Sequence, residues 1–409
     1  MPDRISFFSA FLSPQKRAYR LPLLFCIAAV IVLLCIPTGF EGTLQFRDAV
    51  RCRARVLDVN DERVVDTGLV RSGQQVCTVE FLSGKFKGMR AEGFTLLSGS
   101  LETDTVFVPG DVAQVIVHYR QEESGGVMFL SVHMLDHYRL GSQAVLAICF
   151  ALFLICFSGW TGVRAVFSFA FTVLLIWKVL VPLYLKGVDP IAAGIAAVLV
   201  LTVVIIALVY GFDLRCAAAV SGAFAGVLTA YGIGALCTGI FRIHGAVMTR
   251  SESLLYSGFE DLNLTRIFTA GIFIGAAGAM MDLAVDITSA VHEIVRKKPD
   301  IGRRELCASA MNIARAAMGT MTTTLLLSYS GGCITLLMVF MAQGTPVYNI
   351  LNYRHMSAQI LDILAGSFGL VTVGPFTAAA SSFVLVRNKN TEKNNRKKGK
   401  KELTKGREV

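Results

Sequence analysis

Long stretches without a charged residue constrain this chain more than any other feature. A bilayer-spanning helix needs about 18 or more consecutive apolar residues, and several stretches exceed that length. They cover residues 21–40, 140–163, 190–212, 216–241 and 316–353. Since 54% of the residues are hydrophobic and only 17% are charged, we expect a polytopic α-helical membrane protein rather than a soluble enzyme core. The lipid bilayer is then its main surroundings.

Basic residues beside the apolar stretches predict the orientation, because segments rich in Lys and Arg stay in the cytoplasm. Such segments are residues 1–20, Arg164, Arg215, 296–304 and 387–409. All of them fall inside if about eight helices span the plasma (inner) membrane and both termini are cytoplasmic. The expected spans are 21–40, 141–160, 165–185, 190–211, 216–241, 267–293, 309–330 and 361–386. No small-residue cleavage site follows the first helix, so we expect it to be retained.

Residues 333–350 are apolar enough to suggest a ninth span. A full crossing there would place the basic tail outside the cytoplasm, against the positive-inside rule. We therefore expect this segment to be re-entrant or interfacial.

The pattern changes between Glu41 and Arg139, where short runs of β-branched and aromatic residues alternate with glycine-containing turns. This pattern predicts a small antiparallel β domain, plausibly a five- or six-stranded barrel of the OB or a related type. The domain has 11 basic and 14 acidic residues, which suits an extracytoplasmic location opposite the basic loops.

Five regions follow from these patterns. They are the cytoplasmic N-terminus with the first helix (1–40), the extracytoplasmic β domain (41–139), helices two to five with an outer loop (140–265), the core helices (266–386), and a basic, disordered cytoplasmic tail (387–409). The tail has ten Lys and Arg and three Glu, so it supplies most of the formal net charge of +10. It predicts attraction to anionic headgroups rather than binding to nucleic acid.

The expected helix 267–293 has small residues and acids on one face. Asp282 and Asp286 are four residues apart, and the same face continues through Gly271, Gly275 and Gly278. Small residues allow a neighbouring helix to approach closely, and an acid inside the bilayer is costly unless it faces protein or water. We expect an ion or proton site here. The alternative is that both acids are structural and wetted at the cytoplasmic end.

The next helix offers a partner for these acids. Asn312, Arg315 and Thr322 lie on one stripe, and counting residues from the inner leaflet places Arg315 at the depth of Asp282. We therefore expect an Asp282–Arg315 pair between the two helices. The alternatives are that Arg315 extends to the cytoplasmic headgroups and that the threonine hydroxyls bond to their own helix.

Other features have simpler interpretations. Gly222 and Gly226 predict close packing of helix on helix. Cys52 and Cys77, the two cysteines of the β domain, could form a disulfide in an oxidising compartment or remain buried thiols. The set His118, His133, Asp136 and His137 lacks the spacing of a metal site. We expect no metal, no cofactor and no enzyme activity, since the phosphate-binding, nucleophile and zinc-protease motifs are absent.

Two segments resemble a known family. Residues 278–294 read GAMMDLAVDITSAVHEI and residues 311–332 read MNIARAAMGTMTTTLLLSYSGG. With the plan of one helix, a β-rich domain and a helical block, they resemble the YibE/F-like family of bacterial multispanning membrane proteins. The family pattern has N-I-G-R where this chain has Ala314 before Arg315. The resemblance implies membership but no established activity.

A more distant resemblance is to the SecD/SecF helices of the resistance-nodulation-division transporters, in which Asp282 would take the place of the membrane acid. This resemblance implies coupling to protons or sodium ions. Our first hypothesis is therefore an ion-gradient-coupled secondary transporter or export factor of unspecified substrate. The alternative is a non-transporting scaffold whose β domain binds an envelope protein or lipid. The oligomeric state does not follow from the sequence.

Overall fold

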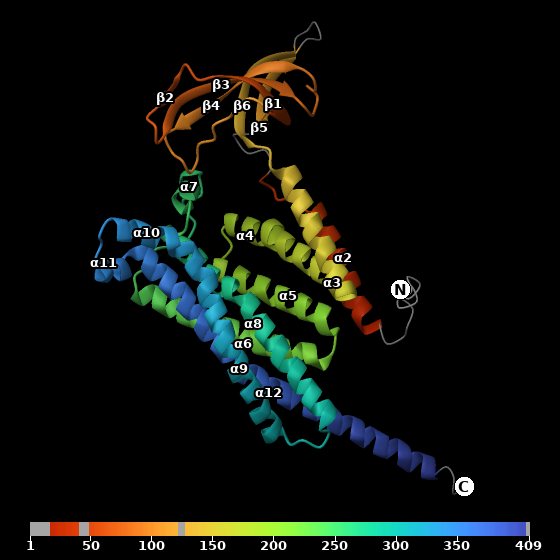
Figure 1. Ribbon diagram of the computed structural model, residues 1–409. Coiled ribbons are helices and arrows are strands. Elements are labelled where there is room, and N and C mark those ends of the chain that lie inside the picture. The colour runs from red at the N-terminus through yellow and green to blue at the C-terminus, as the bar shows by residue number, and fades with distance from the viewer. Residues whose placement is uncertain (1–16, 41–48, 122–126, 406–409) are drawn as a thin grey trace. The chain divides into compact units, whose positions relative to one another are not determined.

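The computed structural model describes residues 17–40, 49–121 and 127–405, in two compact units. One unit is Gly39–Phe157 and the other combines the preceding residues with Ser158–Val409 (Figure 1). Most of the predicted cytoplasmic N-terminus, residues 1–16, and the last residues of the tail, 406–409, lie outside the described residues.

The first unit contains a small β barrel. Its strands are β1 (Val50–Asn60), β2 (Val64–Asp66), β3 (Arg71–Phe81), β4 (Arg90–Ser98), β5 (Val112–Gln121) and β6 (Val127–His137). β1 pairs antiparallel with both β3 and β5, and this double pairing closes the ring β1-β5-β6-β4-β3. β4 and β6 pair in parallel at a single position, Phe94 with His133. This strand order is that of the OB fold, a Greek-key barrel that is partly open.

Alternating side chains fill the barrel. Cys52, Ala54 and Val56 of β1 are buried, as are Val79 and Phe81 of β3. The period of two places these residues on one face of each strand, and closure of the sheet turns that face inward. The barrel therefore has a core of its own.

The strand register rules out the disulfide between Cys52 and Cys77. Cys77 lies opposite Val59, whereas Cys52 pairs with Val115 at the other part of β1. Seven residues of strand separate Cys52 from Val59, roughly 23 Å at the usual rise, and a disulfide needs Cα atoms within about 7 Å. Both thiols are free and buried. Burial raises the pKa of each to about 11, and the Asp61 and Asp111 carboxylates add to the rise at Cys77.

The rest of the described chain is helical. The long helices are α2 (Arg17–Cys35), α3 (Leu140–Leu175), α5 (Pro190–Tyr210), α6 (Leu214–Ile240), α8 (Leu264–Lys297), α9 (Arg303–Ser330) and α12 (Arg354–Lys405). Shorter helices are α4 (Val181–Leu185), α7 (Ser251–Tyr256), α10 (Ile334–Ala342) and α11 (Val347–Asn352), with single turns at η3 (Ile176–Leu180), η4 (Gly245–Val247) and η5 (Gly331–Cys333).

Six helices of the described chain are long and apolar enough to span a membrane, so this is a multi-pass membrane protein. They are Leu140–Leu185, Pro190–Tyr210, Leu214–Ile240, Leu264–Lys297, Arg303–Ala342 and Arg354–Val386. The sequence predicted about eight. The apolar part of α2, Leu21–Cys35, is shorter, and two predicted spans are merged in Leu140–Leu185.

The merged helix has a break rather than a loop. Gly159 has φ 56° and ψ −128°, outside the helical region. The whole run has 46 residues, about 69 Å of helix, more than twice the thickness of the hydrocarbon core. A single straight crossing therefore cannot contain it.

The two ends of the helical block also differ from simple spans. α10 has 9 residues, about 13 Å of helix, and α11 has 6, so neither crosses a bilayer alone. The backbone of α12 continues as helix through Lys405, whereas we expected disorder from residue 387. Extending an existing helix avoids the cost of nucleation, and Lys and Glu are good helix formers.

α12 lies against α6, α8 and α9 at the centre of the block (Figure 1). Glycines make the α6 contact close. A Cβ atom on Gly222 would lie 2.0 Å from Thr377 Oγ1, and one on Gly226 would lie 2.3 Å from Val373 Cγ2. The core of this block is formed mainly by α6, α8 and α12.

Candidate functional site

One face of α8 combines glycines and acids, and its residues are exposed on the surface of the single chain. Its members are Gly271, Gly275, Gly278, Asp282, Asp286 and Ser289, and all six are exposed. The opposite face, including Met280, Leu283 and Ile287, is completely buried. The helical period places the polar residues together, and packing on α6 and α12 turns them outward.

Asp282 and Asp286 have no hydrogen-bonding or ion-pair partner in the described part of the chain. Gly271 and Gly278 have no other atom within 4 Å of a Cβ position, so no helix of the described residues covers them. The close approach that we expected at this stripe occurs only at Gly275, where a Cβ would lie 2.4 Å from Tyr329 Oη.

The end of the polar face nearer the α8–α9 connection is tied to α5. The Tyr210 hydroxyl lies 2.6 Å from Ser289 Oγ and 2.5 Å from the Val285 carbonyl oxygen, to which it donates a hydrogen bond. Arg215 stacks over the Tyr210 ring at 5.3 Å from its centroid. These contacts hold the turn of α8 next to Asp286 in place.

Arg315 lies at the level of Asp286. Gly366 of α12 faces both Ala276 of α8 and Leu325 of α9, so these two residues share one level. Asp286 is ten residues beyond Ala276, and Arg315 is ten residues before Leu325. The two helices run in opposite directions, so both side chains lie about 15 Å further toward the α8–α9 connection.

The predicted Asp282–Arg315 pair is nevertheless not formed within the described chain. Arg315 is exposed, and its Nη1 donates to Asn312 Oδ1 at 3.2 Å. Acid and base are each on the exposed face of their own helix rather than in the seam between the helices. Residue counting placed Arg315 at the depth of Asp282, one turn away from Asp286, the level that the packing gives it. The direction of each side chain depended on how the helices pack.

The threonines of α9 bond to their own helix. The Thr322 hydroxyl donates to the Met318 carbonyl at 2.8 Å, and Thr320, Thr323 and Thr324 make equivalent bonds. Lys178 donates to the Ile36 carbonyl oxygen at 3.1 Å, next to the end of α2. That carbonyl is at the negative end of the helix dipole, which suits an ammonium group.

A second polar cluster was missed by the sequence analysis. Asp362 of α12 has a buried Oδ1, and Tyr329 of α9 has a buried hydroxyl, and neither atom has a hydrogen-bond partner. The expected last span, 361–386, places Asp362 at its first turn. Because α12 starts at Arg354, Asp362 lies two turns inside the helix. The sequence did contain a signal for this cluster, because Asp362 is the single acid in the apolar residues 355–386.

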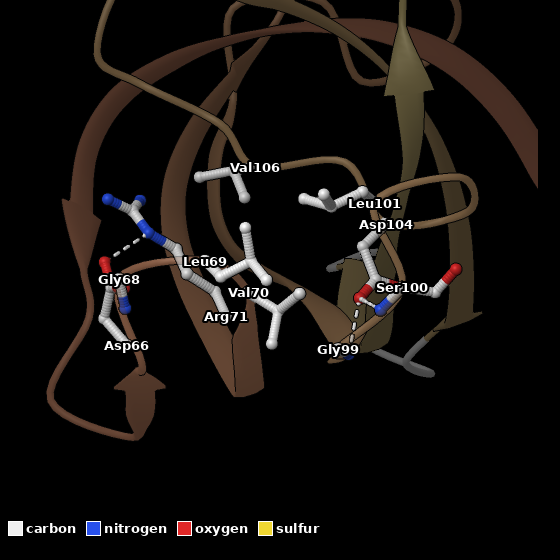
Figure 2. Close-up of a pocket in the computed structure, with 10 residues that line it drawn as sticks. All are labelled: Asp66, Gly68, Leu69, Val70, Arg71, Gly99, Ser100, Leu101, Asp104 and Val106. Atoms are coloured by element: carbon white, nitrogen blue, oxygen red, sulfur yellow. Dashed lines mark hydrogen bonds and ion pairs between the residues drawn. The ribbon is translucent and has the colours of Figure 1, made fainter. Parts of the chain in front are cut away.

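The β barrel has a pocket of about 320 Å³ between the β2–β3 turn and the segment after β4. Figure 2 shows its apolar residues between an Asp66–Arg71 ion pair on one side and Asp104 on the other. Leu69 and Leu101 are 77% and 75% exposed. The pocket thus presents apolar side chains within a charged rim.

The histidines of the barrel are divided among separate contacts. The rings of His118 and His133 have centroids 6.0 Å apart, while His137 Nδ1 lies 3.7 Å from Asp111. Asp136 pairs with Arg139. In the described residues these side chains do not form a group that could hold a metal ion.

Comparison with known proteins gives one family. No curated protein and no solved structure matches the chain, so the resemblance to SecD/SecF stays a prediction. Residues 146–387 match the profile of the YibE/F-like proteins. This match covers more than half of the chain, including α5, α6, α8, α9 and the apolar part of α12. The chain therefore belongs to the YibE/F-like family.

Proposed function

We propose that this YibE/F-like protein is an ion-gradient-coupled secondary transporter or export factor of the plasma membrane, with about eight spans and both termini in the cytoplasm. The observation that supports the proposal is the pair of unpartnered carboxylates, Asp282 and Asp286, on an otherwise apolar membrane helix. An ionised acid at the bilayer centre costs at least about 2.5 to 3.5 kcal/mol. Binding a proton or a sodium ion would remove that cost.

The open polar face is closed by a second copy of the chain in this proposal. Acids on α8 and Arg315 on α9 lie at one level, so a twofold axis along the membrane normal would bring Asp286 of one copy to Arg315 of the other. Each interface would contain both pairs. The small residues Gly271 and Gly278 would let the copies approach closely.

Ion flux in sealed vesicles tests the transport proposal. Asp282→Asn and Asp286→Asn should each abolish gradient-dependent flux of protons or sodium, because an amide neither titrates nor balances a cation. The matched control is Asp261→Asn, an exposed acid outside the helices. Equal flux in the wild-type protein and in both α8 variants would refute the role of these acids.

Cross-linking tests the second copy. Gly278→Cys, in a background with the exposed Cys35, Cys149 and Cys156 changed to Ala, should form a disulfide dimer under mild oxidation. Leu283→Cys, on the buried face of α8, should not. Disulfide dimers at both positions would indicate random collision. The absence of a dimer with Gly278→Cys would contradict the proposal that a second copy covers this face.

The scaffold alternative is favoured by the barrel pocket, where exposed Leu69 and Leu101 could receive an apolar segment of an envelope partner. Under this alternative the activity of the protein in cells depends on the barrel pocket and not on the α8 acids. The double variant Leu69→Asp, Leu101→Asp should then fail to replace the wild-type protein in cells that lack it, while Asp282→Asn should replace it fully.

A further inference from the structure

We infer that Asp362 of α12 is a proton-binding site, in which a carboxyl with one buried oxygen is held in its neutral form beside the Tyr329 hydroxyl. The site is separate from the exposed acids of α8. It does not require that the chain transports anything, so it extends beyond the proposed function.

Two polar atoms without a partner lie at one level of the packed helices. Asp362 Oδ1 and Tyr329 Oη are both buried and have no hydrogen-bond partner in the described residues. Buried polar groups normally have hydrogen-bond partners, so two adjacent exceptions need an explanation. Within the described residues, neither side chain has a hydrogen bond or an ion pair.

Close helix packing produces this arrangement. Gly366 is one turn after Asp362. A Cβ atom on Gly366 would lie 3.0 Å from Ala276 Cβ and 3.6 Å from Leu325 Cδ2. Tyr329 is one turn after Leu325, so it reaches the level of Asp362. Its hydroxyl occupies the space that a side chain on Gly275 would fill.

The surroundings favour a proton over a metal cation. Tyr329 from α9 is the titratable group that faces Asp362, while α8 contributes Gly275 and Ala276 and the neighbouring cluster contributes Ile233 and Cys237 of α6. The carboxyl and one hydroxyl are too few oxygens for a hard cation, which takes six or more. Taking up one proton from solution removes the charge of the carboxylate without any further ligand.

Carbodiimide labelling tests the assignment on the full-length protein. Dicyclohexylcarbodiimide is an apolar reagent that adds to protonated carboxyls, and peptide mass spectrometry reads each acid separately. We expect modification at Asp362 at pH 7 and its decline at higher pH. An ordinary carboxyl is protonated in only about one molecule in a thousand at pH 7, so exposed Asp261 should remain unlabelled.

Two variants keep the test interpretable. Asp362→Asn should lose this label while keeping the wild-type melting temperature, because an amide resembles the neutral acid. Tyr329→Phe should keep the label, because the proton is on the carboxyl. The inference is overturned if folded protein is unlabelled at Asp362, if sodium chloride but not choline chloride protects it, or if Asp362→Asn lowers the melting temperature. If Asp282→Asn abolishes flux while Asp362 is still labelled normally, the inference stands, because the proton site on α12 is then independent of the α8 acids.

Discussion

At the residue scale, single side chains decide how closely the helices approach. Gly222 and Gly226 allow α12 to lie directly on α6, whereas Gly232 of the same helix has no atom within 4 Å of a Cβ position. The glycine pattern alone could not separate these cases, because contact depends on the neighbouring helix.

Gly222→Ala should therefore destabilise the helical block. The added methyl group would lie 2.0 Å from Thr377 Oγ1 and 2.8 Å from the Thr377 backbone, so α6 and α12 must move apart. Overpacking of this kind costs about 1 to 3 kcal/mol. Thermal unfolding in detergent measures it, with Gly232→Ala as the control in the same helix. Equal melting of the two variants would contradict the close contact.

The barrel cysteines should be inert in the folded protein. Burial raises the pKa of Cys52 and Cys77 to about 11, and the thiolate is the reactive form. Iodoacetamide at pH 8 should leave both thiols unmodified until denaturant is added, as mass spectrometry would show. Failure to alkylate either one after denaturation under non-reducing conditions would instead reveal a disulfide.

At the element scale, acidic side chains secure the turns of the barrel. Asp66 accepts hydrogen bonds from the Gly68 amide and from Arg71, and these bonds lower its pKa. At Asp104, partial burial acts to raise the pKa, but hydrogen bonds from the Ser98 hydroxyl and the Ser100 and Gly99 amides outweigh it. The pKa of Asp104 is therefore lowered overall.

A lowered pKa predicts stability that is lost in acid. The folded state binds protons more weakly than the unfolded chain, so the contribution is complete above the ordinary aspartate pKa and disappears as pH falls through the folded value. A fragment of residues 39–139, followed by circular dichroism, should melt at a lower temperature at pH 3 than at pH 7. Asp104→Asn should melt lower than wild type at pH 7, and this difference should shrink at pH 3. A constant difference would contradict the assignment.

At the scale of the whole molecule, the two units have separate cores. The family match begins at residue 146 and so covers the helical block without the barrel. Asp282, Asp286 and Asp362 all lie in the matched part.

The topology makes a prediction at this scale. Barrel residues and the carboxyl terminus should be on opposite sides of the membrane, because the positive-inside rule predicts a cytoplasmic location for the basic tail. An impermeant maleimide should label Lys87→Cys, at an exposed position of the barrel, in intact cells. It should label a cysteine added after Val409 only in permeabilised cells. Labelling of both in intact cells would mean that residues 333–350 complete a further crossing.

The sequence by itself determined what depends on local pattern. Apolar length predicted membrane helices, and runs of β-branched and aromatic residues between glycine-containing turns predicted the β domain. The i, i+4 spacing placed Asp282 and Asp286 on one face of α8. These features follow from local composition and from the helical period, which do not depend on distant parts of the chain.

Only the tertiary structure decided what depends on packing and register. It turned the α8 acids and Arg315 outward, separated Cys52 from Cys77 across the barrel, and placed Asp362 beside Tyr329. Each of these features depends on contacts between residues distant in the chain or on the rotation of a helix about its own axis relative to its neighbours. Helical periodicity says which side chains share a face, but contacts with α6 and α12 determine which face is buried.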